Sequence, residues 1–305
     1  MAKNKFFILL LILLFIITAC FSFMMGSNYY RNKKELQQKI LAWNKLKEKI
    51  ILHTRMFNQD AAIVVKDLST GWEIAINEDR LFPSASIVKI PIMASFISAS
   101  AQGRLDLADK LTLRNRYKVL GSGILKSYAG GTEFSLEQLI ELMITQSDNT
   151  AANILIDYLG FDYLNNSFKK LGLNNTNIVR KMMDFKKRKN GIENFTSAQD
   201  LVYILEKIYK RQLINEELSK KCIEILKKQK VKDRIPAKLP PNTIVANKTG
   251  LENGVCHDAG IVFTRKGDFI ICVLTKHSYK TSRPAKRFIS QIALDTYNFY
   301  QANNS

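Results

Sequence analysis

The sequence LFPSASIVKIPIM, residues 81–93, combines an apolar helical pattern with a Ser-x-x-Lys pair formed by Ser86 and Lys89. If a helix begins near Ala85, this spacing places the hydroxyl and the amine on one face, one turn apart. An amine of lowered pKa beside a serine can take the hydroxyl proton and create a nucleophile. Pro91 fits the first turn of such a helix, where backbone donors lack partners. The pair is a candidate nucleophile and base, although an ordinary amphipathic helix capped by a serine shows the same pattern.

The composition is that of a folded protein with room for a sizeable core. The chain has 305 residues, of which 46% are apolar and 24% charged, and its formal net charge is +19. Such a charge favours anionic surfaces or polymers, and a lysine-rich composition bias explains it equally well. No aromatic-basic motif points to nucleic acid, which is not an expected partner. A monomer is expected.

The cysteines and histidines show no spacing typical of metal ligands, so neither a metal nor a cofactor is predicted. Cys256 and Cys272 fall in neighbouring strand-like runs. In an oxidising compartment they could pair, which the sequence leaves open.

Residues 6–25 form a nearly unbroken apolar run behind two lysines, long enough for one membrane span. A cleaved signal is the alternative, because Ile17-Thr18-Ala19-Cys20 resembles a bacterial lipobox that would leave Cys20 lipidated. The apolar run continues past Cys20, which favours an uncleaved anchor. Both alternatives predict that the rest of the chain is tethered to the cytoplasmic membrane and lies outside it.

Strand-like runs occur near both ends of the remaining chain. Residues 60–68 and 72–76 predict a hairpin, and residues 243–248, 260–264 and 269–275 are also strand-like. Helical patterns occupy most of the chain between them, including one that opens with a capping box at Ser135 and Gln138. This order predicts an α+β fold, with an antiparallel sheet built from both chain ends and an inserted all-helical domain. The predicted boundaries are an anchor or signal at 1–26, a connecting helix at 27–58 and a folded domain at 59–302, with its helical part at about 105–235.

Two more short motifs follow Ser86 in the chain. Ser147-Asp148-Asn149 lies at the junction of two predicted helices, and Lys248-Thr249-Gly250 ends a predicted strand. Alone, the first is explained by a helix N-cap and the second by a strand entering a turn. Their occurrence together, in this order, is better explained by a shared chemical purpose.

Acyl transfer requires a nucleophile, a base, an oxyanion site, a proton route to the leaving nitrogen and an anchor for substrate charge. Ser86 and Lys89 would provide the nucleophile and the base. Ser147, near the second amine of Lys248, would pass a proton to the leaving nitrogen, and Asn149 would hydrogen-bond a substrate amide.

The strand that carries the third motif would complete the site. Gly250 would let it lie close to the Ser86 helix, where a side chain would collide. If the strand has a free edge, a substrate could add to it through backbone hydrogen bonds. The N–H groups of Leu251 and Ser86 would then form the oxyanion hole. Lys248 and Thr249 would bind a substrate carboxylate.

The three motifs together resemble the serine β-lactamase and penicillin-binding protein superfamily. The resemblance is closest to class A and covers roughly residues 45–300. It also includes Phe82-Pro83-Ser84-Ala85, Gly121-Ser122-Gly123-Ile124-Leu125 and Val255-Cys256-His257-Asp258-Ala259-Gly260. The family fold implies a five-stranded antiparallel sheet packed with helices beside an all-helical domain.

One departure from class A concerns the second half of the reaction. Class A enzymes carry a Glu-x-x-Leu-Asn loop whose Glu activates the water that hydrolyses the acyl-enzyme. Residues 179–194 here read VRKMMDFKKRKNGIEN and lack it. Asp184 and Glu193 are the acids available as that base, and each also has a structural explanation.

A second departure concerns the substrate carboxylate. Cys256 stands about where many class A enzymes place an Arg for this group, and His257 or Lys276 would have to compensate.

The resemblance implies a serine hydrolase of the β-lactamase type, which forms an acyl-enzyme with β-lactams. The alternative is a D,D-peptidase or transpeptidase acting on peptidoglycan stem peptides, which the missing Glu favours and the compact size disfavours. A non-catalytic envelope-binding protein is a third alternative, against which the intact set of motifs argues. The expected partner is therefore a β-lactam or a peptidoglycan-type acyl donor.

Overall fold

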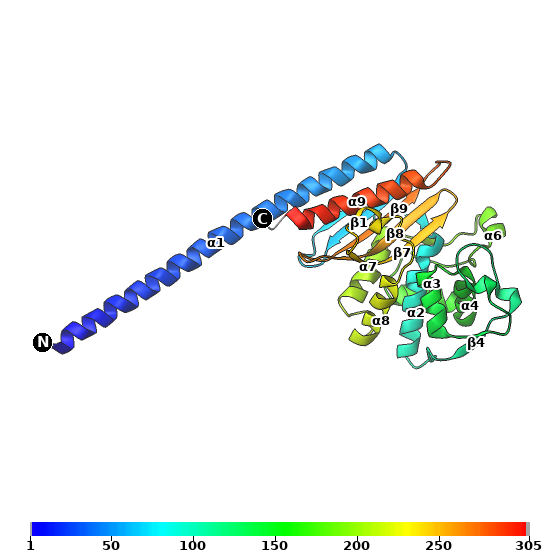
Figure 1. Ribbon diagram of the computed structural model, residues 1–305, viewed down its shortest axis with the longest axis horizontal. Coiled ribbons are helices and arrows are strands. Elements are labelled where there is room, and N and C mark those ends of the chain that lie inside the picture. The colour runs from blue at the N-terminus through cyan, green and yellow to red at the C-terminus, as the bar shows by residue number, and fades with distance from the viewer. Residues whose placement is uncertain (1, 303–305) are drawn as a thin grey trace. The chain divides into compact units, whose positions relative to one another are not determined.

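The computed structural model describes residues 2–302, with side chains from residue 13 onward. Its centre is a five-stranded antiparallel sheet in the order β2-β1-β9-β8-β7 (Figure 1). The strands come from both ends of the folded region: β1 (Asp60–Asp67), β2 (Glu73–Ile76), β7 (Ile244–Glu252), β8 (Val255–Phe263) and β9 (Phe269–Lys276). The predicted α+β fold with a five-stranded antiparallel sheet is confirmed.

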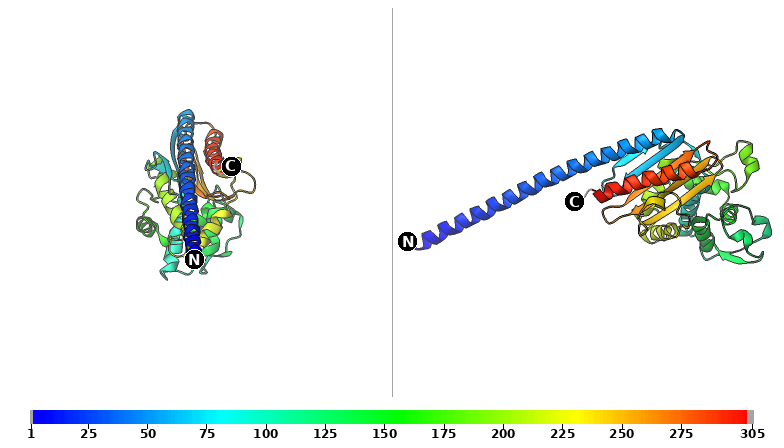
Figure 2. Two further views of the ribbon diagram at one scale, coloured as in Figure 1. Left: turned by 90° about the vertical axis from the view of Figure 1, so that its left-hand side faces the viewer. Right: turned by 45° about the horizontal axis from the view of Figure 1, so that its top comes forward.

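Helices cover both faces of this sheet. Helix α9 (Arg283–Ala302) lies along one face, whereas α7 (Ala198–Tyr209) contacts β1, β8 and β9 from the other (Figures 1 and 2). Alternate residues of a strand point to opposite faces, and Ile270, Cys272 and Leu274 belong to the core cluster that includes α7. The central strands are therefore nearly continuous apolar runs, because both of their faces are buried.

The helical region lies between the two halves of the sheet in sequence. Its capping box is confirmed, because Ser135 Oγ accepts the N–H of Gln138 and Gln138 Oε1 accepts that of Ser135. The α-helices are α2 (Lys89–Ala101), α3 (Leu136–Thr145), α4 (Asn149–Leu159), α5 (Phe161–Lys170), α6 (Phe185–Lys189), α7 and α8 (Glu216–Lys227). Two short two-stranded sheets lie outside the main sheet, in which β3 (Phe82–Pro83) pairs with β6 (Phe195–Thr196) and β4 (Lys110–Thr112) pairs with β5 (Glu133–Ser135). The short 3₁₀ helices are η1 (Ala85–Val88), η2 (Asn115–Tyr117), η3 (Leu125–Ser127) and η4 (Ile235–Lys238).

The N-terminal segment is one continuous helix, α1 (Ala2–Phe57), with no break between the predicted anchor and the predicted connecting helix. By length and composition, α1 is able to cross a membrane. The chain divides into two compact units, residues 1–48 and the folded unit from Lys49 onward. Within the folded unit, Lys49 Nζ and His53 Nε2 each lie 2.8 Å from the buried carboxylate of Asp295 on α9.

The possible pairing of Cys256 with Cys272 does not occur, because both are buried free thiols. In the register of β8 and β9, Cys256 is opposite Thr275 and Cys272 is opposite Ala259. The two cysteines therefore lie three positions apart on opposite faces of the sheet, and a disulfide has no route between them.

Strand β8 begins at Val255, five residues before the predicted start at Gly260. His257 and Asp258 conceal this first half in the sequence, because they are polar yet fully buried. Both are hydrogen-bonded inside the fold, which is what allows polar groups to be buried in a strand.

Candidate active site

Ser86 and Lys89 lie at the start of the buried helix α2. Ser86 is half-buried within η1, and Lys89 is the first residue of α2. Residues three apart in a 3₁₀ turn are eclipsed, so both side chains project from the same face. A hydrogen bond joins this segment to residues 179–194, because the N–H of Ser84 donates to the carbonyl of Asn194 over 2.7 Å.

Lys89 is fully buried, and its ammonium points at the second motif. Nζ donates to Ser147 O over 2.8 Å, to Asn149 Oδ1 over 2.9 Å and to Ser147 Oγ over 3.3 Å. Burial lowers the pKa of Lys89 to about 7, against the opposing effect of the negative charges of Asp148 and Glu252. A substantial fraction of the side chain is therefore a neutral amine at neutral pH, which is the form that can accept a proton.

Lys248 reaches the same hydroxyl from the third motif. Its Nζ donates to Ser147 Oγ over 3.0 Å and to Thr249 O over 2.7 Å. Burial lowers the pKa of Lys248 well below the ordinary value, and the charges of Lys89 and Arg234 lower it further. The Ser147 hydroxyl thus lies between two desolvated amines.

The second motif owes its shape to the loop at residues 121–125. Asp148 Oδ2 accepts the N–H groups of Ile124 and Leu125 over 2.6 and 2.8 Å, and its Oδ1 accepts that of Ala151 as the N-cap of α4. Gly123 has a φ of +107°, and a Cβ there would lie 2.2 Å from the Asp148 side chain. Only glycine fits at this position.

Strand β7 approaches the Ser86 segment closely, as predicted for a glycine at position 250. A Cβ on Gly250 would lie 3.4 Å from that of Ala85 and 3.3 Å from the ring of His257. Because β7 is an edge of the sheet, its backbone beyond Gly250 is available for an extended substrate. The next residue, Leu251, is 48% exposed.

Methionines occupy the place where residues 179–194 approach the site. Asn149 and Asn153 lie one turn apart on α4, so they share a face. Asn149 contacts Lys89. The side chain of Asn153 accepts the N–H of the buried Met182 over 2.7 Å and donates to the Met182 carbonyl over 3.1 Å. A Cβ on Gly121 would lie 2.8 Å from Asn149 Nδ2 and 3.0 Å from Met183 Sδ, so the next methionine also lies near Asn149.

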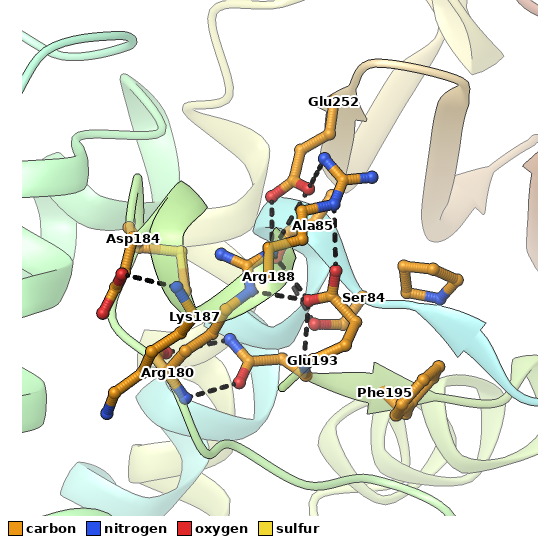
Figure 3. Close-up of polar contacts among 12 residues, drawn as sticks. Ser84, Ala85, Arg180, Asp184, Lys187, Arg188, Glu193, Phe195 and Glu252 are labelled. Atoms are coloured by element: carbon orange, nitrogen blue, oxygen red, sulfur yellow. Dashed lines mark hydrogen bonds and ion pairs between the residues drawn. The ribbon is translucent and has the colours of Figure 1, made fainter. Parts of the chain in front are cut away.

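The two acids of this segment make contacts of other kinds. Asp184 is the N-cap of the short helix α6, where its Oδ1 accepts the N–H of Lys187 over 3.1 Å (Figure 3). Glu193 accepts Arg180 Nε over 2.7 Å and lies 3.1 Å from Arg188 Nε.

The same two arginines also contact Glu252 at the end of β7. Arg180 Nη2 lies 3.2 Å and Arg188 Nη1 2.8 Å from its carboxylate (Figure 3). Arg180, Arg188, Glu193 and Glu252 thus form a four-residue ion cluster that ties the segment to β7.

His257 is not a cation that compensates for the cysteine at position 256. It is fully buried, its Nε2 donates to Pro83 O over 2.8 Å and its Nδ1 accepts the N–H of Thr275 over 3.0 Å. Burial lowers the pKa of His257 to about 4, so the ring is neutral. Lys276 is exposed at the end of β9.

The cation beside Cys256 is Arg234, a residue that no sequence motif predicted. It is 2% exposed, and its Nε donates to Cys256 Sγ over 3.3 Å. No motif surrounds Arg234, so the sequence offered no signal for it. Asn153 was also missed, although its position four residues after Asn149 was such a signal.

The sequence model of the beta-lactamase enzyme family matches residues 44–300 of this chain. The chain belongs to this family. Among curated members, beta-lactamase VEB-1 of Pseudomonas aeruginosa is 29% identical over 245 residues, covering 74% of this chain and 81% of VEB-1. The extended-spectrum beta-lactamase PER-1 of the same organism is 28% identical over 245 residues, covering 74% of this chain and 78% of PER-1.

Solved structures of similar fold include both a beta-lactamase and PBP-A. The beta-lactamase from Sphaerobacter thermophilus has a TM-score of 0.77 and 28% identity, over 85% of this chain and 97% of that one. PBP-A also has a TM-score of 0.77, with 31% identity over 84% of this chain and 96% of PBP-A. A PBP-A mutant described as an acyl-enzyme complex with penicillin-G is 30% identical, with a TM-score of 0.77 over 85% of this chain and 97% of that one. The predicted class A β-lactamase-like serine hydrolase is confirmed.

Proposed function

We propose that this protein reacts with β-lactams to form an acyl-enzyme on Ser86 and hydrolyses the lactam amide. The observation that carries the proposal is the convergence of two buried amines, Lys89 and Lys248, on the hydroxyl of Ser147. Burying two amines around one serine costs stability, and groups desolvated in this way cluster at functional sites.

In the acylation step, neutral Lys89 accepts the Ser86 proton as Oγ attacks the lactam carbonyl. The N–H groups of Ser86 and Leu251 stabilise the oxyanion. When the C–N bond breaks, Ser147 donates its proton to the nitrogen and is reprotonated through the amines. The products of this step are an ester on Ser86 and a free secondary amine.

Substrate binding is assigned to the surrounding polar groups. Asn149 binds the acyl amide, and Lys248 with Thr249 binds the carboxylate on the leaving side. Arg234 adds positive charge there, since it lies against Cys256 and its charge lowers the pKa of Lys248. Gly250 keeps the strand close enough for these contacts.

Deacylation is the slow step in this proposal. The residue held beside Asn153 is the apolar Met182, so this position of residues 179–194 supplies no carboxylate. Asp184 and Glu193 are the acids of that segment that could activate water, and the oxygens of both already accept contacts. The same observation favours a second candidate function, a penicillin-binding D,D-peptidase or transpeptidase, and PBP-A is a relative at 31% identity.

We further propose that the folded unit lies outside the cytoplasmic membrane, with the apolar part of α1 as its tether. The support is the length and apolar composition of α1. Cys20 is exposed and free, as a lipidation site requires, and lipoprotein processing there remains the alternative form of attachment. The proposed assembly is a monomer.

The test is intact-mass spectrometry of the full-length protein in detergent, followed over time after mixing with penicillin G. We expect an adduct of the mass of the intact penicillin on Ser86, which clears as the penicillin is hydrolysed. An adduct that persists without turnover would support the peptidase instead. The complete absence of an adduct would contradict both functions.

A further inference from the structure

Arg188 lies on the short helix α6, and its guanidinium group reaches the end of β7 (Figure 3). Its Nη1 lies 2.8 Å from the carboxylate of Glu252, and its Nη2 donates to the carbonyl of Asn253 over 3.4 Å. Asn253 follows Glu252 directly, between β7 and β8. Arg188 therefore connects residues 179–194 to the edge strand of the sheet at two points, and we call these three residues the clamp.

Glu252 extends from the face of β7 that meets the Ser86 segment. Alternate residues of a strand point to the same face, so the Glu252 side chain shares the face of Gly250. A Cβ on Gly250 would lie 3.4 Å from that of Ala85, the residue before Ser86. The contact between Arg188 and Glu252 is thus on the side of β7 that faces the proposed active site.

The proposed function fixes which part of a substrate would lie at the end of β7. Lys248 and Thr249 are assigned to the carboxylate on the leaving side, and the N–H of Leu251 is assigned to the oxyanion. A substrate that pairs with the edge of β7 therefore directs its acyl group past Leu251, toward Glu252 and Asn253. The carbonyl of Asn253 is the next acceptor along this edge, because alternate residues direct their backbone groups to the same side.

The ion cluster holds the clamp in place. The buried Arg180 has its Nη2 3.2 Å from Glu252 and 2.7 Å from Glu193. Glu193 in turn lies 3.1 Å from Arg188 Nε. Each of the two carboxylates thus lies between two guanidinium groups, and such charge-assisted contacts restrict the Arg188 side chain to its position at the edge of β7.

We propose that Arg188 determines the specificity of the acyl site, because the clamp leaves room for compact acyl groups and blocks bulky or extended ones. This inference rests on the proposed function and names its substrate class. The preferred acyl donors are lactams with a compact acyl group, whereas long peptides and fused-ring acyl groups would collide with the Arg188 side chain. One methylene group more or less in a binding pocket already changes relative rates by roughly 10–200-fold.

Two penicillins that differ only in the acyl group test this proposal. The second-order rate of acylation of the full-length protein in detergent is measured by rapid quench and intact-mass spectrometry. The probes are penicillin G, with a phenylacetyl group, and nafcillin, with a bulky substituted naphthoyl group. In the wild-type protein we expect nafcillin to react at least about tenfold more slowly. The ratio of the two rates is taken within each variant, so a general change in activity cancels.

Removing the clamp should relax this selectivity. Arg188→Ala should bring the ratio about tenfold closer to one, and the segment should stay in place because Arg180 still pairs with Glu193 and Glu252. Glu252→Gln is a second variant that should relax the ratio to a similar extent. The double variant should add nothing further, since both changes remove the same contact.

Lys181→Ala is the matched control. Lys181 belongs to the same segment, and its Nζ lies 2.7 Å from the carboxylate of Asp157 on α4, away from β7. This change also removes one cation and one ion pair from the segment. It should leave the ratio of the two rates unchanged, because the clamp remains intact.

Three results would overturn the proposal while acylation persists. One is a wild-type ratio near one, and another is an unchanged ratio in both Arg188→Ala and Glu252→Gln. The third is an equal relaxation in Lys181→Ala, which would assign the effect to a loosened segment. If neither penicillin forms an adduct with the wild-type protein, the proposed function fails and this inference fails with it.

Discussion

The side chain of Asn153 and the backbone of Met182 are joined by two hydrogen bonds, because Asn153 Oδ1 accepts the N–H of Met182 and Nδ2 donates to its carbonyl. Asn153 lies one helical turn from the Asn149 that contacts Lys89, so an apolar residue is held next to that turn of α4. We therefore expect the identity of the residue at position 182 to affect the lifetime of the acyl-enzyme.

Replacing Met182 by glutamate should shorten the lifetime of the penicillin adduct at least about tenfold, because a positioned carboxylate can activate the hydrolytic water. Intact-mass measurements after removal of free penicillin give this lifetime. Met182→Gln is the control, since it has the same shape without the base. Equal acceleration in both variants would show that loosened packing, rather than a base, is responsible.

Replacing Ser86 by alanine should abolish the adduct while leaving the protein folded, because the nucleophilic oxygen is lost and little packing changes. The chain offers a matched control in its second Ser-x-x-Lys, at Ser167 and Lys170 on α5. Ser167→Ala should keep the wild-type rate of acylation, measured by mass spectrometry. An adduct that still forms in Ser86→Ala would move the site elsewhere.

The rate of acylation should rise with pH through neutrality. Lys89 acts as a base only when neutral, and its pKa is about 7, so its neutral fraction grows about tenfold between pH 6 and pH 8. Stopped-flow or rapid-quench acylation at constant ionic strength measures this, and circular dichroism at each pH confirms that the protein stays folded. A flat profile over this range would exclude Lys89 as the base.

The contribution of Lys89 to the stability of the protein should also rise with pH, as the rate of acylation does. The pKa of Lys89 is lower in the folded state than in the unfolded chain, so the unfolded state binds more protons between pH 7 and about 10.5. The contribution of Lys89 to stability therefore increases with pH in that window. Its cost is greatest below pH 7, where both states are protonated.

Replacing Glu193 by glutamine should destabilise the protein by roughly 1–3 kcal/mol, because Arg180 is buried and would lose a charged partner. This corresponds to a fall in Tm of about 2–10 °C, measurable by calorimetry. Asp184→Asn is the control, since Asn caps a helix as well as Asp does.

The Glu193→Gln and Asp184→Asn variants also test which residue, if either, activates the water for deacylation. Neither change should lengthen the lifetime of the penicillin adduct if both acids are structural. A lifetime at least about tenfold longer in one variant would identify that residue as the base.

The fold was largely predictable because its signals are local. Apolar runs marked most of the strands, and the pairing of Ser135 with Gln138 marked a helix start. The first half of β8 was not predicted, because His257 and Asp258 are polar residues. They are buried only because hydrogen bonds to distant segments satisfy their polar atoms.

The sequence alone determined the three motifs, their order and the family to which they belong, because each motif depends on side chains a few residues apart. Only the tertiary structure decided how these groups meet: Lys89 and Lys248, far apart in the chain, share the Ser147 hydroxyl. The tertiary structure also placed Arg234 beside Cys256 and engaged Glu193 with two arginines. Burial and charge contacts between distant segments are properties of packing, and a pattern of neighbouring residues does not contain them.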